Sequence, residues 1–336
     1  MQTSSESGRE QNARLSALSP QALSSRLRGQ GGLALLVAVL GIGYWLLDAV
    51  IELPQEVRRI RVGDGIDSIV DFLTDNVAWL FDAISAILRT PINNLESLVH
   101  WPPAIAFAIL AGAFAWWLRS WQFGIVAILG FLLIDAMAMW EPAMDTLALV
   151  VVAAIVALII GVPVGIGAAR SQVLSLVVRP VLDFMQTLPV FVYLLPAVAF
   201  FGIGTVPGAV ATLVFAIPPG VRLTELGIRQ VDQTTIEAAY AFGATPNQVL
   251  RQVQLPLALP TIMAGVNQVI MLALSMVVIV GMIGAGGLGG EVVRGISRLN
   301  ISLAFEGGIS VVIIAIFLDR VTEGIGRRAR QSLGLA

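Results

Sequence analysis

The sequence predicts an all-α integral membrane protein with about eight transmembrane helices. Hydrophobic residues make up 57% of the 336 residues and charged residues only 12%, and the mean hydropathy is +0.87. Soluble domains contain about 25% charged residues. Several apolar runs approach the roughly 20 residues that an α-helix needs to cross the hydrocarbon core of a bilayer. The lipid bilayer is therefore the first partner that we expect.

Taken in chain order, the elements begin with residues 1–30, which are polar and predict a disordered cytoplasmic tail. A signal peptide would have a much shorter charged region. The expected spans follow at about 31–51, 103–118, 121–139, 144–168, 184–203, 206–221, 260–283 and 304–319. We expect residues 31–100 to form a first span with an outer segment, 101–140 to add further spans, and 141–330 to form the main membrane core.

An amphipathic helix is predicted between the first two spans. Apolar residues follow the 3.6-residue helical period between residues 66 and 88, and the opposite face carries the carboxylates Asp67, Asp71, Asp75 and Asp82. Helices that bind the anionic cytoplasmic leaflet have basic residues on that face, so an acidic face favours the outer surface. Two roles are open: a scaffold or docking site for an extracytoplasmic partner, and a brace packed on neighbouring spans.

The distribution of arginine predicts the orientation. Eight spans place both termini on the same side of the membrane, and the positive-inside rule selects that side. All twenty basic residues are arginines. With a cytoplasmic amino terminus, only six of the twenty lie outside, namely Arg58, Arg59, Arg61, Arg89, Arg294 and Arg298. We therefore expect both termini in the cytoplasm.

A polar stretch, residues 222–256, interrupts the apolar spans on the expected cytoplasmic side. Thr234 and Glu237 have the spacing of a capping box, in which the two residues satisfy each other's backbone amides at the start of a helix. Gly243 suits a left-handed exit from that helix. The pattern predicts a first short helix that ends in a bend.

A second capping box follows directly, with Thr245 as the cap, Pro246 at the first helical position and Gln248 reaching back. Pro256 is expected to close this second helix. Together the two helices form a compact helix-turn-helix finger, which we call the coupling finger, residues 222–256.

The coupling finger resembles the EAA loop of ABC-importer permease subunits. The shared pattern consists of Glu237-Ala238-Ala239, Gly243 six residues after the glutamate, and Leu255-Pro256. Val253 stands where the family usually has isoleucine, which is a mild departure. The flanking segments 183–193, 215–219, 260–268 and 286–289 resemble the permeases of glycine betaine/L-proline importers. The resemblance covers roughly residues 140–328.

This resemblance implies a type I ABC-importer permease of the bacterial inner membrane. It implies ATP-driven uptake of a compatible solute: glycine betaine, proline betaine or proline, or, with the same machinery, choline, carnitine or trimethylamine N-oxide. The implied partners are a dimer of ABC ATPase subunits that binds ATP and Mg, an extracytoplasmic substrate-binding protein, and a second copy of this chain. Coupling to the ATPase is implied for Glu237, Ala238, Ala239, Gly243, Leu255 and Pro256.

The residue inventory independently argues against catalysis in this chain. There is no lysine, which a Walker A phosphate loop requires, and there is no cysteine and only one histidine, His100. Residues 284–289 match G-x-G-x-x-G but lack the βαβ context of a dinucleotide site. We expect no cofactor, metal site or nucleic-acid partner.

Polar groups at membrane depth often mark a transport pathway. Gln186, Thr187 and Tyr193 lie on the expected fifth span, and Asn267 and Ser275 on the seventh. These are the candidate pathway residues, although neutral polar groups also join helices to each other. An ion-gradient-driven transporter is the alternative class; it would need coupling-ion ligands and an inverted repeat.

Overall fold

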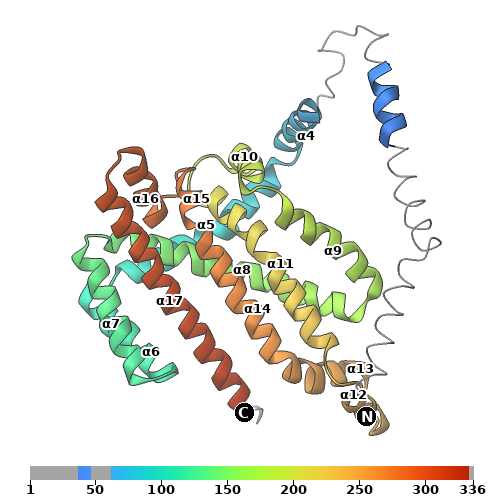
Figure 1. Ribbon diagram of the computed structural model, residues 1–336. Coiled ribbons are helices and arrows are strands. Elements are labelled where there is room, and N and C mark those ends of the chain that lie inside the picture. Colours follow the sequence, from blue (N-terminus) through green and yellow to red (C-terminus); the bar gives the residue numbers. More distant parts are fainter. Residues whose placement is uncertain (1–36, 47–61, 333–336) are drawn as a thin grey trace, which may run out of the picture. The chain divides into compact units, whose positions relative to one another are not determined.

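The computed structural model describes residues 37–46 and 62–332, and the regular elements within them are all helices (Figure 1). The chain divides into two units, Met1–Asp67 and Ser68–Ala336. The first contains the apolar helix Val37–Leu46 and the start of α4 (Val62–Asn76). The predicted tail and the rest of the predicted first span lie outside the described residues.

The second unit contains all the later helices. They are α5 (Ala78–His100), α6 (Ala104–Leu118), α7 (Trp121–Ala136), α8 (Trp140–Arg170), α9 (Gln172–Thr187), α10 (Val190–Phe201), α11 (Thr205–Arg229), α12 (Gln233–Ala241), α13 (Pro246–Gln248), the π-helix η1 (Val249–Gln254), α14 (Leu255–Ser275), α15 (Val277–Gly281), α16 (Gly287–Ser297) and α17 (Ile301–Ser332).

Four helical stretches in the described residues are long and apolar enough to cross a membrane: Trp140–Arg170, Thr205–Arg229, Pro246–Gly281 and Ile301–Gln331. The number rises to six if two bent pairs each count as one span, α5 with α6 (104°) and α9 with α10 (97°). The expected spans at 31–51 and 121–139 fall on shorter apolar helices. The predicted all-α membrane architecture is confirmed, with four to six spans identified in place of eight uniform ones.

The predicted continuous span at 184–203 is wrong, because the chain bends between α9 and α10. Proline disfavours helical geometry in the residue before it. Leu188, which precedes Pro189, accordingly has extended backbone angles, φ −63° and ψ 132°. The amphipathic helix α9 and the apolar helix α10 are therefore two separate helices.

The predicted amphipathic helix at 66–88 also differs from the structure. It is divided between α4 and α5, and α5 continues to His100. Leu88 and Ile92 of α5 are each only 1% exposed, and Phe81 stacks on Phe200 of α10 with ring centroids 4.3 Å apart. For α5 these contacts favour a brace packed on neighbouring helices.

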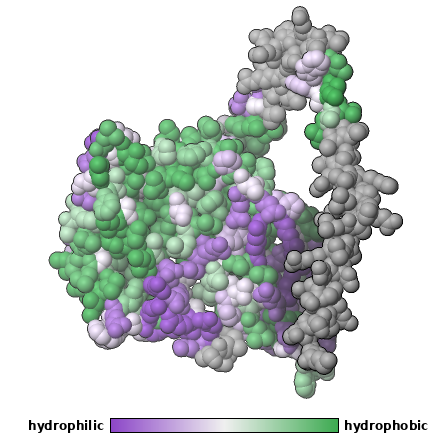
Figure 2. Space-filling view, in the orientation of Figure 1, coloured by the Kyte–Doolittle hydropathy of each residue, from purple (hydrophilic) through white to green (hydrophobic). Residues whose placement is uncertain are grey.

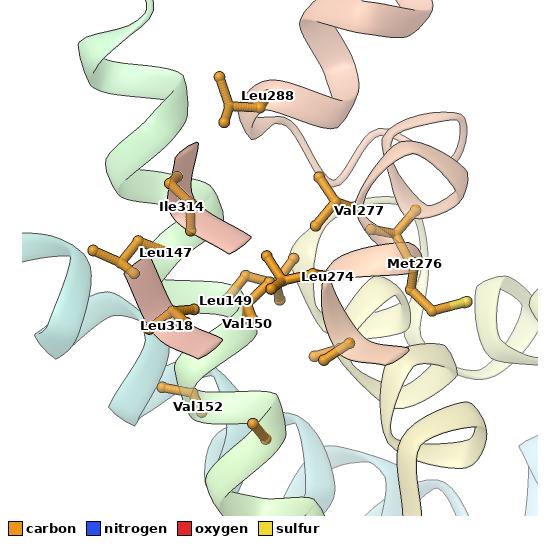
Figure 3. Close-up of a cluster of buried hydrophobic side chains, with 14 of the residues drawn as sticks. Leu147, Leu149, Val150, Val152, Leu274, Met276, Val277, Leu288, Ile314 and Leu318 are labelled. Carbon is orange, nitrogen blue, oxygen red and sulfur yellow. The ribbon is translucent and has the colours of Figure 1, made fainter. Parts of the chain in front are cut away.

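The core of the second unit surrounds α8. Side chains from α8, α14, α15, α16 and α17 meet in one apolar cluster (Figure 3). On another face α8 packs closely against α11, and a Cβ added at Gly165 would lie 2.6 Å from the carbonyl oxygen of Val221. Without a side chain at Gly165, the two backbones approach closely enough to bury both helices.

Hydrophobic and hydrophilic residues occupy different parts of the surface of the second unit. In Figure 2 hydrophobic side chains cover most of the visible upper bundle, and hydrophilic side chains gather toward the lower edge. The coupling finger and the end of α17 lie at that lower edge, whereas α16 lies at the opposite end (Figure 1). Exposed apolar residues along the sides of the bundle are what the hydrocarbon core of a bilayer requires of the helices that cross it.

Candidate functional site: the coupling finger and its attachments

The coupling finger, residues 222–256, includes the end of α11. Its first helix, α12, has Asp232 as the N-cap and starts at Gln233. The expected capping box of Thr234 and Glu237 is therefore wrong. Thr234 instead donates its hydroxyl to Asp232 Oδ2, and Glu237 Oε1 accepts from Gln233 Nε2 at 3.3 Å. The helix starts two residues earlier than expected, and the Asp232 carboxylate at its start accepts hydrogen bonds from the hydroxyls of Thr234 and Thr235.

The exit from α12 matches the prediction. Gly243 has φ +83°, in the left-handed region that favours glycine. Its amide donates to Tyr240 O at 2.9 Å, and the amide of Ala244 donates to Ala239 O at 3.1 Å. This pair of bonds is a Schellman motif, which satisfies carbonyls at a helix end while the chain turns.

The second capping box is confirmed, since the Thr245 amide donates to Gln248 Oε1 at 2.7 Å and Pro246 occupies the first helical position. The expected end at Pro256 is wrong. A π-helical turn, η1, leads directly into α14, and Pro256 lies inside a helical run from Pro246 to Gly281. Proline lacks an amide donor and disturbs the usual i→i−4 pattern; a π turn just before it accommodates that change within a continuous helix.

The two halves of the finger differ in burial. Leu250 of η1 is buried in a small apolar cluster with Ile228 of α11 and Ile262 of α14. No residue of α12 is buried, and two aromatic residues at its end are accessible: Tyr240 is 47% exposed and Phe242 is 93% exposed. The base of the finger is therefore fixed to two long helices, and its tip presents an aromatic surface.

The structure places the other predicted coupling residues along this element. Glu237 and Ala238 are exposed on α12, and Ala239 is half-buried. Leu255 and Pro256, half-buried, begin α14. Small side chains beside exposed aromatics leave room for a partner surface to approach the α12 backbone.

A buried ion cluster near the finger was not predicted. Glu225 of α11, whose side chain is only 6% exposed, accepts hydrogen bonds from Ser175 Oγ (2.7 Å) and Arg179 Nη2 (3.0 Å) of α9. Arg229 lies 3.1 Å from the same carboxylate and donates to Ala168 O of α8 at 2.9 Å. The cluster joins α8 and α9 to the part of α11 with which the finger begins, just before α12.

The sequence contains part of the evidence for this cluster. Glu225 is the one carboxylate of α11 and is followed four residues later by an arginine, a spacing that brings the two side chains together. The partners on α9 are about fifty residues away, and only the tertiary structure shows them.

The candidate pathway residues do not form one group. Gln186 and Thr187 are exposed at the end of α9, before the bend, and Tyr193 lies on α10 beyond it. Ser275 is exposed and donates to Met271 O at 2.9 Å, which satisfies its hydroxyl within α14. Asn267 is half-buried and lines a cavity between α14 and α17.

Two of these residues carry buried polar atoms without a hydrogen-bond partner among the described residues, Tyr193 Oη and Asn267 Oδ1. Within the same described residues, no group of three or more histidine, aspartate or glutamate side chains is placed to hold a metal ion.

The fold defines a class of protein, an all-α integral membrane protein whose exposed finger joins two long helices of the bundle. Comparison with known sequences gives the family. The profile of the binding-protein-dependent transport system inner membrane component family matches residues 161–331. The chain belongs to this family.

Three relatives are close in sequence. The glycine betaine transport system permease protein OpuAB of Bacillus subtilis is 48% identical over 267 residues, 80% of this chain and 95% of the relative. The glycine betaine/proline betaine permease ProW of Escherichia coli is 48% identical over 266 residues, 77% and 75% of the two chains. The glycine betaine/carnitine permease GbuB of Listeria monocytogenes is 46% identical over 278 residues, 82% and 98%.

Proposed function

We propose that this chain is the permease subunit of an ATP-driven importer for glycine betaine and related compatible solutes. The family and the names of its close relatives support this function. The observation that carries it is the coupling finger, whose tip is exposed and whose base continues directly into α11 and α14. This arrangement suits a subunit that receives mechanical work from a partner.

The mechanism follows from the connection between the finger and the bundle. α12 follows the 25-residue helix α11 after a three-residue turn, and η1 continues without a break into α14. A displacement of the tip is therefore transmitted to two membrane helices as a rigid-body movement. Phe242 and Tyr240 seat in the ATPase, Ala238 and Ala239 allow close approach, and Gly243 fixes the bend.

The partners are a dimer of ABC ATPase subunits, an extracytoplasmic binding protein and a second copy of this chain, so that each ATPase subunit receives one finger. The ATPase binds ATP and Mg. Closure of the ATPase dimer draws the two fingers together and opens the pathway outward, and hydrolysis resets it. This chain provides the transport pathway and transmits the movement of the ATPase to it, and it makes or breaks no covalent bond.

Import requires the finger to face the ATPase in the cytoplasm, and we propose that both termini of this chain lie on the same side. The distribution of arginine supports this orientation. Residues 222–256 then lie inside, and α16 and its turn into α17 lie outside.

The experiment is ATP-driven uptake of radiolabelled glycine betaine into proteoliposomes that contain the full transporter and its binding protein. Wild type should accumulate betaine only when ATP is present on the finger side. Unlabelled carnitine, choline and trimethylamine N-oxide, added in excess, identify the solute that competes best. ATP-independent uptake driven by an ion gradient would contradict the proposal.

Gly243→Asp provides the matched test of the finger. It adds a side chain and a charge at a position with φ +83°, and we expect uptake to be lost. Gly243→Asn is the control, because asparagine is sometimes found at the left-handed position that ends a helix, and it should retain most of the uptake.

A further inference from the structure

The geometry points to a binding site for a zwitterionic solute in the cavity between α14 and α17, in the half of the bundle nearest the finger. This inference rests on the proposed import function and adds a place where this chain itself contacts the solute. α14 and α17 pack against each other (Figure 1). The cavity between them has a volume of about 350 Å³, within the roughly 300–1,000 Å³ typical of small-molecule sites.

The charges that line the cavity balance. α17 contributes two carboxylates and two guanidinium groups, from Asp319, Glu323, Arg320 and Arg330. A solute with one positive and one negative group can interact favourably with both signs, whereas a simple cation or anion meets a like charge without compensation. The formal charge of zero therefore favours a zwitterion.

The four charged groups differ in the number of ion pairs that they form. Arg320 lies 3.6 Å from Asp319 and 3.2 Å from Glu323. Glu323 also pairs with Arg119 and lies 3.0 Å from Arg327. Arg330, by contrast, forms no ion pair with any part of the chain that the structure describes. Arg330 is thus free to bind a solute carboxylate, and Asp319, with a single partner at 3.6 Å, can face a positive group.

The α14 side of the cavity suits the other end of such a solute. Met263 provides polarisable apolar surface, and Asn267 Oδ1 is buried there without a hydrogen-bond partner in the described residues. An unsatisfied buried oxygen is unfavourable. The methyl groups of a quaternary ammonium are polarised by its charge and can approach such an oxygen through C–H···O contacts. Asn267, Met263 and Asp319 thus surround the ammonium, and Arg330 meets the carboxylate.

The test is binding of radiolabelled glycine betaine at millimolar concentrations to the full transporter in nanodiscs, without binding protein or ATP. We expect saturable binding that unlabelled betaine competes and choline, a cation without a carboxylate, does not. Asn267→Leu and Asp319→Asn should each weaken binding by about tenfold, the effect of losing one contact to a charged group. Gln268→Leu is the control on the exposed side of the same turn and should change binding by less than about twofold.

Each result decides the question. Saturable, choline-resistant binding that both variants weaken supports the site. Absence of saturable binding, equal competition by choline, or wild-type binding in both variants overturns it. Gel filtration and retention of the ATPase confirm that the variants are folded. Asp319→Asn also replaces the side chain with one of nearly the same shape. ATP-driven uptake is measured on the same preparation: wild-type uptake without binding contradicts only this site, whereas absence of uptake contradicts the proposed function.

Discussion

Glu225 joins the start of the finger to neighbouring helices of the bundle. Its buried carboxylate accepts from Ser175 and Arg179 of α9 and pairs with Arg229, which also caps the end of α8. Buried charges are tolerated only when they are paired and hydrogen-bonded. The cluster therefore makes the relative position of three helices depend on one side chain.

Replacing Glu225 should destabilise the protein more than replacing an exposed partner in the same region. Glu225→Gln keeps a hydrogen-bonding side chain but loses the charge. We expect the free energy of unfolding to fall by about 1–3 kcal/mol, which would be measured as a lower apparent Tm in detergent. Asp183→Asn is the control, because Asp183 is exposed and pairs with Arg222 at the surface; it should cost under about 1 kcal/mol. Equal effects of the two substitutions would contradict the role of the buried cluster.

Asp232 gives a second prediction at this scale. The Thr234 hydroxyl, which donates to Asp232 Oδ2, holds the pKa of this exposed carboxyl below its usual value. A pKa lowered by folding adds stability that is present above the usual aspartate pKa of about 3.9 and is lost as pH falls through the lower, folded-state value. The start of α12 should therefore be insensitive to pH near neutrality and weaken only in acid.

Carboxyl-carbon NMR titration checks this expectation. Thr234→Val should raise the pKa of Asp232 toward its ordinary value. Thr245→Val, which removes a hydroxyl from the other capping site, should leave it unchanged. An unaltered Asp232 titration in the Thr234 variant would show that the hydroxyl is not the cause.

At the scale of elements, local sequence signals predicted where helices end or bend better than they predicted where a helix continues. Gly243 and the Thr245–Gln248 box lie where the pattern placed them. Thr234 fitted a cap equally well, but Asp232 begins the helix, because several adjacent residues could serve as caps and the pattern does not rank them. Pro256 is a helix breaker in isolation, yet tertiary packing and a π turn keep the helix continuous.

The contact between α8 and α11 gives the clearest prediction about an element. Alanine is favoured over glycine inside a helix by about 1 kcal/mol, so Gly308→Ala, where an added Cβ meets nothing within 4 Å, should leave Tm unchanged or raise it. Gly165→Ala should lower Tm, because its Cβ would lie 2.6 Å from the Val221 carbonyl oxygen. A shift of the same sign in both variants would mean that the helices are not in close contact.

At the scale of the whole molecule, the hairpin of α6 and α7 is joined to the end of α17. Arg119, in the turn of the hairpin, pairs with Glu323, and the Arg328 guanidinium lies 3.9 Å from the Trp117 ring centroid. The sequence predicted the hairpin's apolar character but not these contacts, which join residues about two hundred positions apart. Composition and periodicity predict helices in membranes; they do not specify which helices meet.

The proposed orientation can be tested across the whole molecule, because the natural sequence has no cysteine. Asn247→Cys introduces a single exposed thiol on the finger, and Ser297→Cys introduces one on α16 at the opposite end (Figure 1). A membrane-impermeant maleimide should label the Ser297 variant in intact cells and the Asn247 variant only after permeabilisation. The reverse pattern would place the finger outside and contradict the proposed mechanism.

The central claim is that the finger binds an ATPase, and purification of the complex tests it most directly. The chain would be purified from its own membranes in mild detergent, and the co-purifying proteins identified and quantified. Wild type should recover one Walker-type ATPase subunit per permease chain. Phe242→Asp, at the exposed tip, should lose the ATPase, whereas Leu299→Asp, at an equally exposed apolar position at the other end, should retain it. Absence of an ATPase with wild type under several mild conditions, or its retention by the Phe242 variant, would contradict the account.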